Sequence, residues 1–509
     1  MRSPSDHRML PTGEPRGPAA WAGLILAVPL ALSAYFALAG RTDLTHPACA
    51  TAAIAVLLGV LWISEALPLA ATSLLPLVLF PLAGVMTFDE AAAPYAKDSI
   101  YIYLGGFIIA LAVERWGLHR RLALHTLMWV GTSPRRLVGG IMLATAVLSM
   151  WISNTATTAM MLPLGLSLVA LTRDHSGKGH QLSETDAQRF ATSILLGIAY
   201  AATIGGLGTL IGTPTNVVFA GFAEQNGLAV GFGRWMLFGT PLAIVYLLFT
   251  WILLTRWMFP LPHAEIGDGL TMIRKELREL GPITRGELVV LLVAVLTASL
   301  WIAREPLQNT AWMQAQFPSV KKHFNDGMIA LIGALLLFAI PVHPRRGIFA
   351  MDWETCKRLP WGVLLLFGGG LSLAEAVEVS KLADWIGLQV SAWGSISLVV
   401  LVIAVTATVI FASEFTSNVA TVAAFLPIML GVSKGLEADP LLLLIATTVA
   451  ASYAFMLPVG TPPNAIAFGT GLIKQREMMR AGLVLNLLGV VLIPLAIYTL
   501  GVWALGIKV

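Results

Sequence analysis

The chain consists of apolar runs separated by short polar segments. A helix needs about 20 largely apolar residues to cross the hydrocarbon core of a bilayer, and these runs approach that length. They predict an all-α polytopic membrane protein with about 11 transmembrane helices. The runs expected to cross lie near residues 21–39, 48–64, 68–87, 98–113, 190–224, 236–255, 286–303, 325–342, 361–380, 440–473 and 481–506.

Two pairs of apolar segments differ from the other runs. Residues 137–151 with 156–172, and 395–412 with 420–434, are short, and each pair is polar at its centre. Each pair therefore predicts a re-entrant hairpin that enters the membrane and returns to the same side. An odd number of crossing runs separates the two pairs, so one hairpin enters from inside and the other from outside.

Composition agrees with a membrane protein. The chain is 57% hydrophobic and 12% charged, whereas soluble domains carry about a quarter charged residues. The net charge of +4 does not indicate nucleic-acid binding, because the basic residues lie in short loops between apolar runs. Most of them fall on the inner side if the N-terminus is cytoplasmic. We therefore expect a multi-pass inner (plasma) membrane protein with the lipid bilayer as partner, the N-terminus cytoplasmic and the C-terminus outside.

The strongest pattern in the sequence is an internal repeat. Residues 153–157 (Ser-Asn-Thr-Ala-Thr) recur as residues 417–421 (Ser-Asn-Val-Ala-Thr), 264 positions later. Residues 212–216 (Gly-Thr-Pro-Thr-Asn) recur as 460–464 (Gly-Thr-Pro-Pro-Asn), 248 positions later. The difference matches a polar loop near residues 173–188 that only the first copy contains. Because the hairpins enter from opposite sides, the copies predict two inverted repeats, which place a site near the membrane midplane.

The repeated motifs suggest an ion and anion site. Glycine permits unusual dihedrals and proline removes a backbone donor, so Gly-Thr-Pro predicts a discontinuous helix in each copy. Exposed carbonyls at such breaks can ligate sodium, and helix N-termini can face an anion. Neither motif contains Arg, Lys or His, so bound cations are an economical source of positive charge. An isolated Ser-Asn-Thr would more simply be a helix cap, but two copies, each paired with Gly-Thr-Pro, favour a site.

Several acidic residues lie within or near the apolar runs. A carboxylate buried in a membrane protein is a candidate functional residue. Glu414 precedes the second Ser-Asn motif and is the strongest candidate, although it could equally cap local backbone amides or pair with a scaffold arginine. The other four are Glu65, Glu114, Glu375 and Glu378.

These motifs resemble the divalent-anion/sodium symporter family, whose members carry dicarboxylates, citrate and, in some branches, sulfate. The resemblance covers nearly the whole chain and includes residues 62–68 (Trp-Ile-Ser-Glu-Ala-Leu-Pro), both Ser-Asn tips and residues 451–464. It implies a homodimer in which a transport domain moves against a static scaffold in an elevator mechanism. The implied divisions are a cytoplasmic tail 1–20, a first scaffold segment 21–135 with an amphipathic arm 114–135, a first transport-domain segment 136–256, a cytoplasmic loop with the second scaffold segment 257–394, and a second transport-domain segment 395–509.

The resemblance also implies the site residues. The first sodium site would use Ser149, Ser153, Asn154 and Gly212. The second sodium site would use Ser413, Thr416, Ser417, Asn418 and Gly460. The carboxylate substrate would meet Asn154, Thr155, Thr213, Asn418, Val419, Thr461 and Pro462. Sodium would be the coupling ion, and no organic cofactor is expected.

Val419 departs from the commonest family pattern, which has threonine at this position. The lost hydroxyl removes a hydrogen bond worth on the order of 1 kcal/mol. The exact substrate therefore remains open within the family.

The expected function is sodium-coupled symport of C4-dicarboxylates such as succinate, malate or fumarate. A sodium-independent dicarboxylate exchanger and a sulfate transporter of the same fold remain alternatives. An anion channel is a different class that the repeat alone does not exclude. A membrane-embedded enzyme is disfavoured because the sequence shows no Asp pair, Ser-His dyad or His-Glu-x-x-His motif in its apolar runs.

Overall fold

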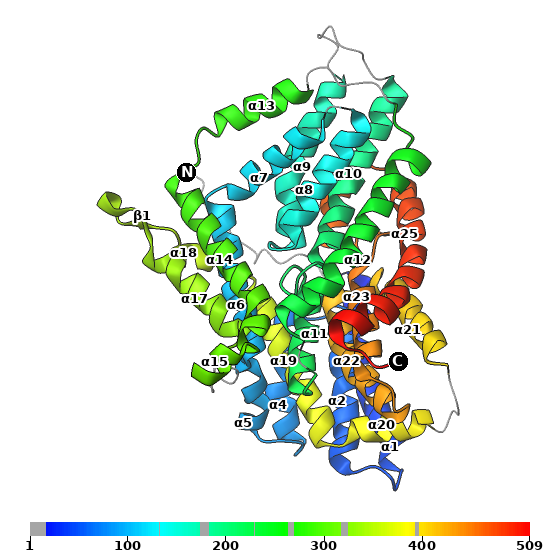
Figure 1. Ribbon diagram of the computed structural model, residues 1–509. Helices are drawn as coiled ribbons and strands as arrows, with labels where there is room; N and C mark the ends of the chain where they lie inside the picture. Colours follow the sequence, from blue (N-terminus) through cyan, green and yellow to red (C-terminus); the bar gives the residue numbers. More distant parts are fainter. Residues whose placement is uncertain are drawn as a thin grey trace, which may run out of the picture.

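The computed structural model describes residues 17–131, 133–173, 183–228, 230–262, 269–316, 324–391 and 397–509. Most of the expected tail (residues 1–16) and the centre of the loop at 173–188 (residues 174–182) lie outside the described residues. The described chain is an elongated bundle of helices (Figure 1). Figure 1 places α6, α14, α17 and α18 on one side of the bundle and α10, α12, α23 and α25 on the other.

The first half of the chain is helical throughout its apolar runs. Its helices are α1 (Pro18–Ala39), α2 (His46–Ile63), α3 (Leu69–Thr72), α4 (Leu75–Leu82), α5 (Phe88–Ala92), α6 (Asp98–Arg115), α7 (Leu118–Val130), α8 (Pro134–Ser149), α9 (Asn154–Arg173), α10 (Glu184–Gly206), α11 (Pro214–Gln225) and α12 (Phe232–Ile252). A π-helical segment, Leu253–Met258, continues α12.

The second half of the chain is also mainly helical. Its helices are α13 (Gly269–Glu279), α14 (Arg285–Gln308), α15 (Ala311–Gln316), α17 (Asp326–Ala339), α18 (Trp353–Cys356), α19 (Trp361–Val379), α20 (Leu382–Ser391), α21 (Leu398–Ser413), α22 (Asn418–Gly435), α23 (Pro440–Ser452), α24 (Pro462–Phe468) and α25 (Gln475–Ala496). A π-helical segment, Ile497–Leu505, continues α25.

The lengths and composition of these helices fit a multi-pass membrane protein. Within the described residues, 9 helical stretches are long and apolar enough to cross a bilayer. They are Pro18–Ala39, His46–Ile63, Phe88–Arg115, Glu184–Gly206, Phe232–Met258, Arg285–Gln308, Trp361–Val379, Asn418–Gly435 and Gln475–Leu505.

The number of candidate membrane-spanning stretches, 9, differs from the expected 11 because several runs form shorter or longer helices than their hydrophobicity predicted. The run at 68–87 divides into α3 and α4, because Pro76 lacks an amide donor and starts a new helix. The runs at 325–342 and 440–473 yield only shorter apolar helices, α17 and α23. Conversely, α22, an expected hairpin arm, is long enough to meet the length criterion.

The structure differs from the expectations in two places: a short strand pair in an otherwise helical chain, and a helix within an expected polar loop. Residues 341–349 contain a small antiparallel pair, β1 (Pro341–His343) and β2 (Ile348–Phe349), which helical periodicity could not reveal. The polar segment expected at 256–285 contains the amphipathic helix α13, which packs against α7 through its buried Ile273.

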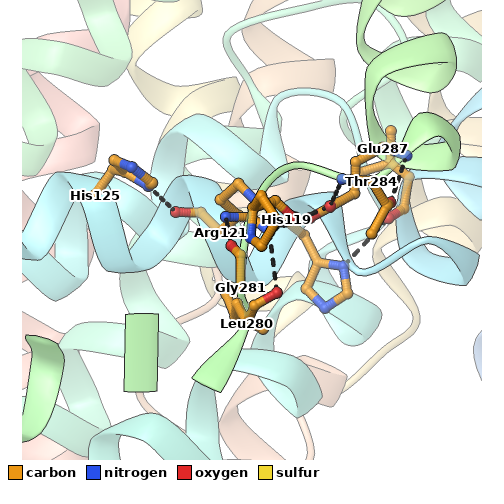
Figure 2. Close-up of polar contacts among 9 residues, drawn as sticks. His119, Arg121, His125, Leu280, Gly281, Thr284 and Glu287 are labelled. Carbon is orange, nitrogen blue, oxygen red and sulfur yellow. Dashed lines mark hydrogen bonds and ion pairs between the residues drawn. The ribbon is translucent and has the colours of Figure 1, made fainter. Parts of the chain in front are cut away.

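A polar cluster joins α7, α13 and α14 (Figure 2). The guanidinium of Arg121 on α7 lies 2.8 Å from a Glu287 carboxylate oxygen on α14 and donates to the Gly281 carbonyl oxygen at 2.9 Å, just after α13. Thr284 is the N-cap of α14, and its backbone N–H donates to the same carboxylate at 2.7 Å. Arg121 therefore links α7 to the start of α14.

His119 lies in the same cluster and faces the chain that precedes α7. Its Nδ1 is 3.3 Å from the Val113 carbonyl oxygen (Figure 2). Burial lowers the pKa of this imidazole below its ordinary value. The ring is therefore neutral near pH 7 and donates through Nδ1–H.

The structure contains the helix interruptions predicted from the repeat. We call residues 150–153 and 414–417 the first and second tips, and residues 207–213 and 453–461 the first and second breaks. The chain leaves helical geometry between α8 and α9, between α21 and α22, between α10 and α11, and between α23 and α24. The copies also interlock, because α9 packs against α24 and α11 packs against α22. The four interruptions therefore belong to one packed region.

Candidate functional site

The two broken helices carry matching hydrogen bonds. Asn216 Nδ2 donates to the Thr209 carbonyl oxygen at 2.8 Å, and Asn464 Nδ2 donates to the Leu457 carbonyl oxygen at 3.1 Å. Donor and acceptor both shift by 248 positions (464 − 216 and 457 − 209). Each asparagine ties the first turn of a half-helix to the irregular segment before it. The repeat seen in the sequence is therefore also a repeat of local structure.

The first tip and the first break bring oxygen atoms together around Asn154. Its inward-facing amide atom lies 2.7 Å from the Ser149 hydroxyl, 3.0 Å from the Ala202 carbonyl oxygen and 3.2 Å from the Gly212 carbonyl oxygen. A Cβ on Gly212 would lie 2.4 Å from the Gly206 carbonyl oxygen, so only glycine fits there. Three of the four residues expected at the first sodium site, Ser149, Asn154 and Gly212, thus converge.

The oxygen-rich first cluster suits a hard cation. If the inward atom of Asn154 is its amide nitrogen, it donates to the neighbouring oxygens; if it is the amide oxygen, it joins them as a ligand. Carbonyl, amide and hydroxyl oxygens are the donors that hard cations prefer. The hydroxyl of Ser153, the fourth expected ligand, accepts from the Ala156 amide at 3.3 Å and caps α9.

The second tip is arranged differently. The hydroxyl of Ser413 donates to Val409 within its own helix at 2.8 Å, and Thr416 contacts Thr421 at 2.7 Å. The backbone carbonyl of Ser417 accepts from the Thr421 amide at 2.9 Å. The Oδ1 atom of Asn418 is buried and has no hydrogen-bond partner among the described residues. Because buried acceptors are normally paired, this oxygen can bind a cation or a donor group.

Gly460, the remaining expected ligand of the second site, faces a carboxylate. A Cβ on Gly460 would lie 3.1 Å from Glu414 Oε2. Glu414 is 1% exposed, and its carboxylate accepts hydrogen bonds from backbone amides of the second break. Of the five acidic residues singled out in the sequence, Glu414 alone is buried, whereas Glu65 and Glu378 are exposed.

The expected substrate residues stand at helix N-termini. Asn154 and Asn418 begin α9 and α22, and Thr213 and Thr461 are the N-caps of α11 and α24. The partial positive charge of a helix N-terminus favours a carboxylate. Thr155 and Pro462 are exposed and Val419 is half-buried, so all three have accessible surface.

Several residues that build the site were not assigned a role from the sequence. Asn216 and Asn464 fix the breaks, and the hydroxyl of Thr209 donates to the Met150 carbonyl and accepts from the Gly212 amide at 3.1 Å. The carbonyl oxygen of Ala202 joins the first cluster from within α10. Asn216 and Asn464 could have been found, because both belong to the repeated motif. A carbonyl inside an ordinary helix gives no sequence signal.

Comparison with known proteins identifies the family. Residues 19–507 match the family described as "Sodium:sulfate symporter transmembrane region". The chain belongs to this family, the divalent-anion/sodium symporters. The sodium-dependent dicarboxylate transporter SdcS of Staphylococcus saprophyticus subsp. saprophyticus is 42% identical over 464 residues, which cover 90% of this chain and 87% of the relative. SdcS of Staphylococcus aureus (strain USA300) is 41% identical over 459 residues, covering 90% and 86%.

Two solved structures show a similar fold. The Alcanivorax borkumensis YdaH transporter superposes with a TM-score of 0.56 at 14% identity, covering 95% of this chain and 98% of that chain. Neisseria gonorrhoeae MtrF, from a class of antimetabolite efflux pumps, superposes with a TM-score of 0.55 at 14% identity, covering 91% and 97%. These structures support the fold, and the family match together with the relatives named as transporters identifies a membrane transporter rather than an enzyme.

Proposed function

We propose that this protein carries C4-dicarboxylates such as succinate, malate or fumarate across the inner membrane, coupled to sodium. The convergence of Ser149, Asn154 and Gly212 with the Ala202 carbonyl supports this reading most directly. An oxygen cluster without a cationic side chain suits sodium, and the neighbouring helix N-termini suit a carboxylate. The relatives named as sodium-dependent dicarboxylate transporters make the same pairing of ion and substrate.

The substrate would bind between the two copies of the repeat. One carboxylate would meet the tip and half-helix of the first copy at Asn154 and Thr213, and the other would meet Asn418 and Thr461 in the second. Val419 and Pro462 would supply apolar surface beside the second carboxylate, and Thr155 would add a hydroxyl beside the first. A bound sodium ion in each copy would offset the charge of the dianion. One sodium ion in each copy would account for the two copies of the motif and for the lack of Arg or Lys in both motifs.

Transport would proceed by an elevator movement. Residues 136–256 and 395–509 would move as one body, and residues 21–135 and 257–394 would form the static scaffold of a homodimer. Inverted repeats support alternating access, because exchanging the conformations of the two copies exchanges the side that is open. The proposal places the N-terminus in the cytoplasm and the C-terminus outside, as the distribution of basic residues favours.

Uptake of labelled succinate into proteoliposomes tests the proposal. We expect uptake to require an inward sodium gradient, to be competed by unlabelled dicarboxylates, and to fall to background in Asn154→Ala and Asn418→Ala. Asn226→Ala is the matched control. That asparagine caps the end of α11 by donating to the Phe222 carbonyl at 2.8 Å, away from both tips, so uptake should stay near wild type.

Other outcomes would redirect the proposal. Uptake that ignores sodium but requires dicarboxylate inside the vesicles would make the protein an exchanger on the same fold. If only sulfate competes, the substrate would be sulfate and not a dicarboxylate, a possibility raised by Val419 and by the sulfate in the family's description. Fast flux that does not saturate, and that does not accumulate substrate against its gradient, would indicate a channel.

A further inference from the structure

The segment between α23 and α24 has no helix to pair its amides. α23 ends at Ser452 and α24 begins at Pro462. Glu414, at the end of α21, reaches into this gap. Its Oε1 accepts from the Phe455 amide at 2.7 Å and the Met456 amide at 2.9 Å, and its Oε2 accepts from the Leu457 amide at 2.9 Å. One buried carboxylate thus satisfies three consecutive amides.

A fourth hydrogen bond orients this carboxylate. Asn486 Nδ2 on α25 donates to Glu414 Oε1 at 2.7 Å, and Asn486 is fully buried. An ionised carboxylate only accepts, and four donors directed at it are the arrangement that stabilises a buried negative charge. Both carboxylate oxygens of Glu414 are therefore held by donors inside the protein.

The first copy of the repeat has no such carboxylate. The position 264 residues before Glu414 is Met150, which has no comparable acceptor in its side chain. The first break closes on its own backbone instead, because the Gly208 amide donates to the Gly205 carbonyl at 2.8 Å. The hydroxyl of Thr209 completes the turn by accepting from Gly212. The two breaks therefore differ by one full negative charge.

That charge lies beside the expected ligands of the second cation. A Cβ on Gly460 would come within 3.1 Å of Glu414 Oε2. Ser413 directly precedes Glu414, and Thr416 and Asn418 follow it closely in the chain. Away from water, a charge beside the ligands of a cation acts strongly on that cation.

We propose that Glu414 is a positioning residue that holds segment 453–461 in its ligand-presenting conformation and gives the second cation site, but not the first, a fixed negative charge. The inference rests on the proposed sodium coupling. It also adds to the ligands available at the second site: besides the side-chain hydroxyls, the backbone of the break would present carbonyl oxygens, and Glu414 shapes that backbone. Glu414 itself stays bonded to amides and need not touch the ion.

Sodium-dependent thermal stability of the purified protein tests this inference. Unfolding would be followed by tryptophan fluorescence, with sodium chloride varied against choline chloride at constant ionic strength. A bound ion stabilises the folded state according to its concentration relative to its dissociation constant. In Glu414→Gln, we expect the sodium concentration for half-maximal stabilisation to rise about tenfold or more, because the charge is lost while the shape is kept.

Two further variants separate a charge effect from general damage. Glu375→Gln is the matched control, since this half-buried carboxylate on α19 accepts from the Gln225 amide away from both tips. Asn486→Ala removes one of the four donors but leaves the charge. We expect an unchanged sodium requirement in Glu375→Gln and a shift of less than about threefold in Asn486→Ala.

Each result has a definite meaning. If Glu414→Gln lowers the unfolding temperature equally at every sodium concentration, the residue is only structural and the inference is overturned. If the wild type shows no sodium-dependent stabilisation, the proposed coupling fails first and the inference falls with it.

If Glu414→Gln does not fold, Glu414→Asp is the deciding variant, because a shorter carboxylate keeps the charge but withdraws it from the amides. A severalfold higher sodium requirement would support the positioning role, and an unchanged one would contradict it.

Discussion

Individual polar residues in this protein pair with backbone that helices cannot satisfy. Unpaired amides and carbonyls are costly inside a membrane protein, and each break exposes several. Asn216, Asn464, Thr209 and Glu414 each bond to such groups. The polar side chains around the site therefore stabilise the irregular backbone in addition to the binding roles proposed for some of them, and their removal should affect stability as well as transport.

Thr209→Val should destabilise the first break. The substitution keeps the side-chain shape but leaves the buried Gly212 amide without its acceptor, at a cost of about 1–3 kcal/mol. The thermal unfolding midpoint of purified protein measures the loss. Thr499→Val is the control, because that exposed hydroxyl bonds only to the Leu495 carbonyl of its own helix, at 2.7 Å. Equal midpoints for the two variants would contradict the role given to Thr209.

At the scale of elements, close approach between backbones decides where glycine is required. The end of α10, the tip after α8 and the start of α11 meet where Gly206 and Gly212 lie. A Cβ on Gly206 would come within 2.4 Å of the Asn154 side chain, and one on Gly212 within 2.9 Å of the Ser149 carbonyl oxygen. These contacts let three separate elements contribute oxygens to one cluster.

Gly212→Ala should therefore abolish the first cluster. The added methyl group would force the break away from Ser149 and Gly206, so we expect succinate uptake to fall to background and sodium-dependent stabilisation to weaken. Gly59→Ala on α2 is the matched control, because nothing lies within 4 Å of its added Cβ. Normal uptake by Gly212→Ala, measured per reconstituted molecule, would exclude the glycine carbonyl as a fixed component of the site.

Over the whole molecule, the proposed moving and static bodies meet beside α12. The ring of Phe232 stacks on that of Trp301 from α14, with centroids 4.4 Å apart. The Phe232 amide also donates to Asp326 Oδ2 at 3.3 Å, and Arg304 holds the same carboxylate at 3.0 Å. An elevator movement would have to break these contacts, so they belong to one end state of the cycle.

A disulfide across this interface should stop transport. The Glu305 side chain reaches Gly231, where an added Cβ would overlap its carboxylate. In a chain without Cys49 and Cys356, we expect the Gly231→Cys/Glu305→Cys pair to cross-link on oxidation, block uptake, and recover activity after reduction. The Gly333→Cys/Thr297→Cys pair lies within the proposed scaffold, with Cβ atoms 3.4 Å apart, and should cross-link without blocking uptake. Full uptake with the first pair cross-linked would refute the assigned division.

The sequence by itself determined the membrane class, the family and the places where helices break. Those properties are local or periodic: run length, repeated motifs, and proline or glycine at fixed offsets. Asn154 and Gly212 could be chosen for the same reason, because their motifs recur. The division of the run at 68–87 and the pair β1–β2 were missed, since the hydrophobicity of a run does not show where a turn interrupts it.

Only the tertiary structure decided which oxygens meet. Ala202 contributes a carbonyl from inside α10, and Glu414 and Asn486 come together from helices far apart in the chain. Their roles depend on the distances between packed elements, and no local pattern encodes those distances. The repeat predicted two similar sites, but Met150 stands where the second copy has Glu414, and only the packing shows which amides that carboxylate holds. The first closes through its own backbone and the Thr209 hydroxyl, whereas the second also takes three backbone hydrogen bonds from a buried carboxylate.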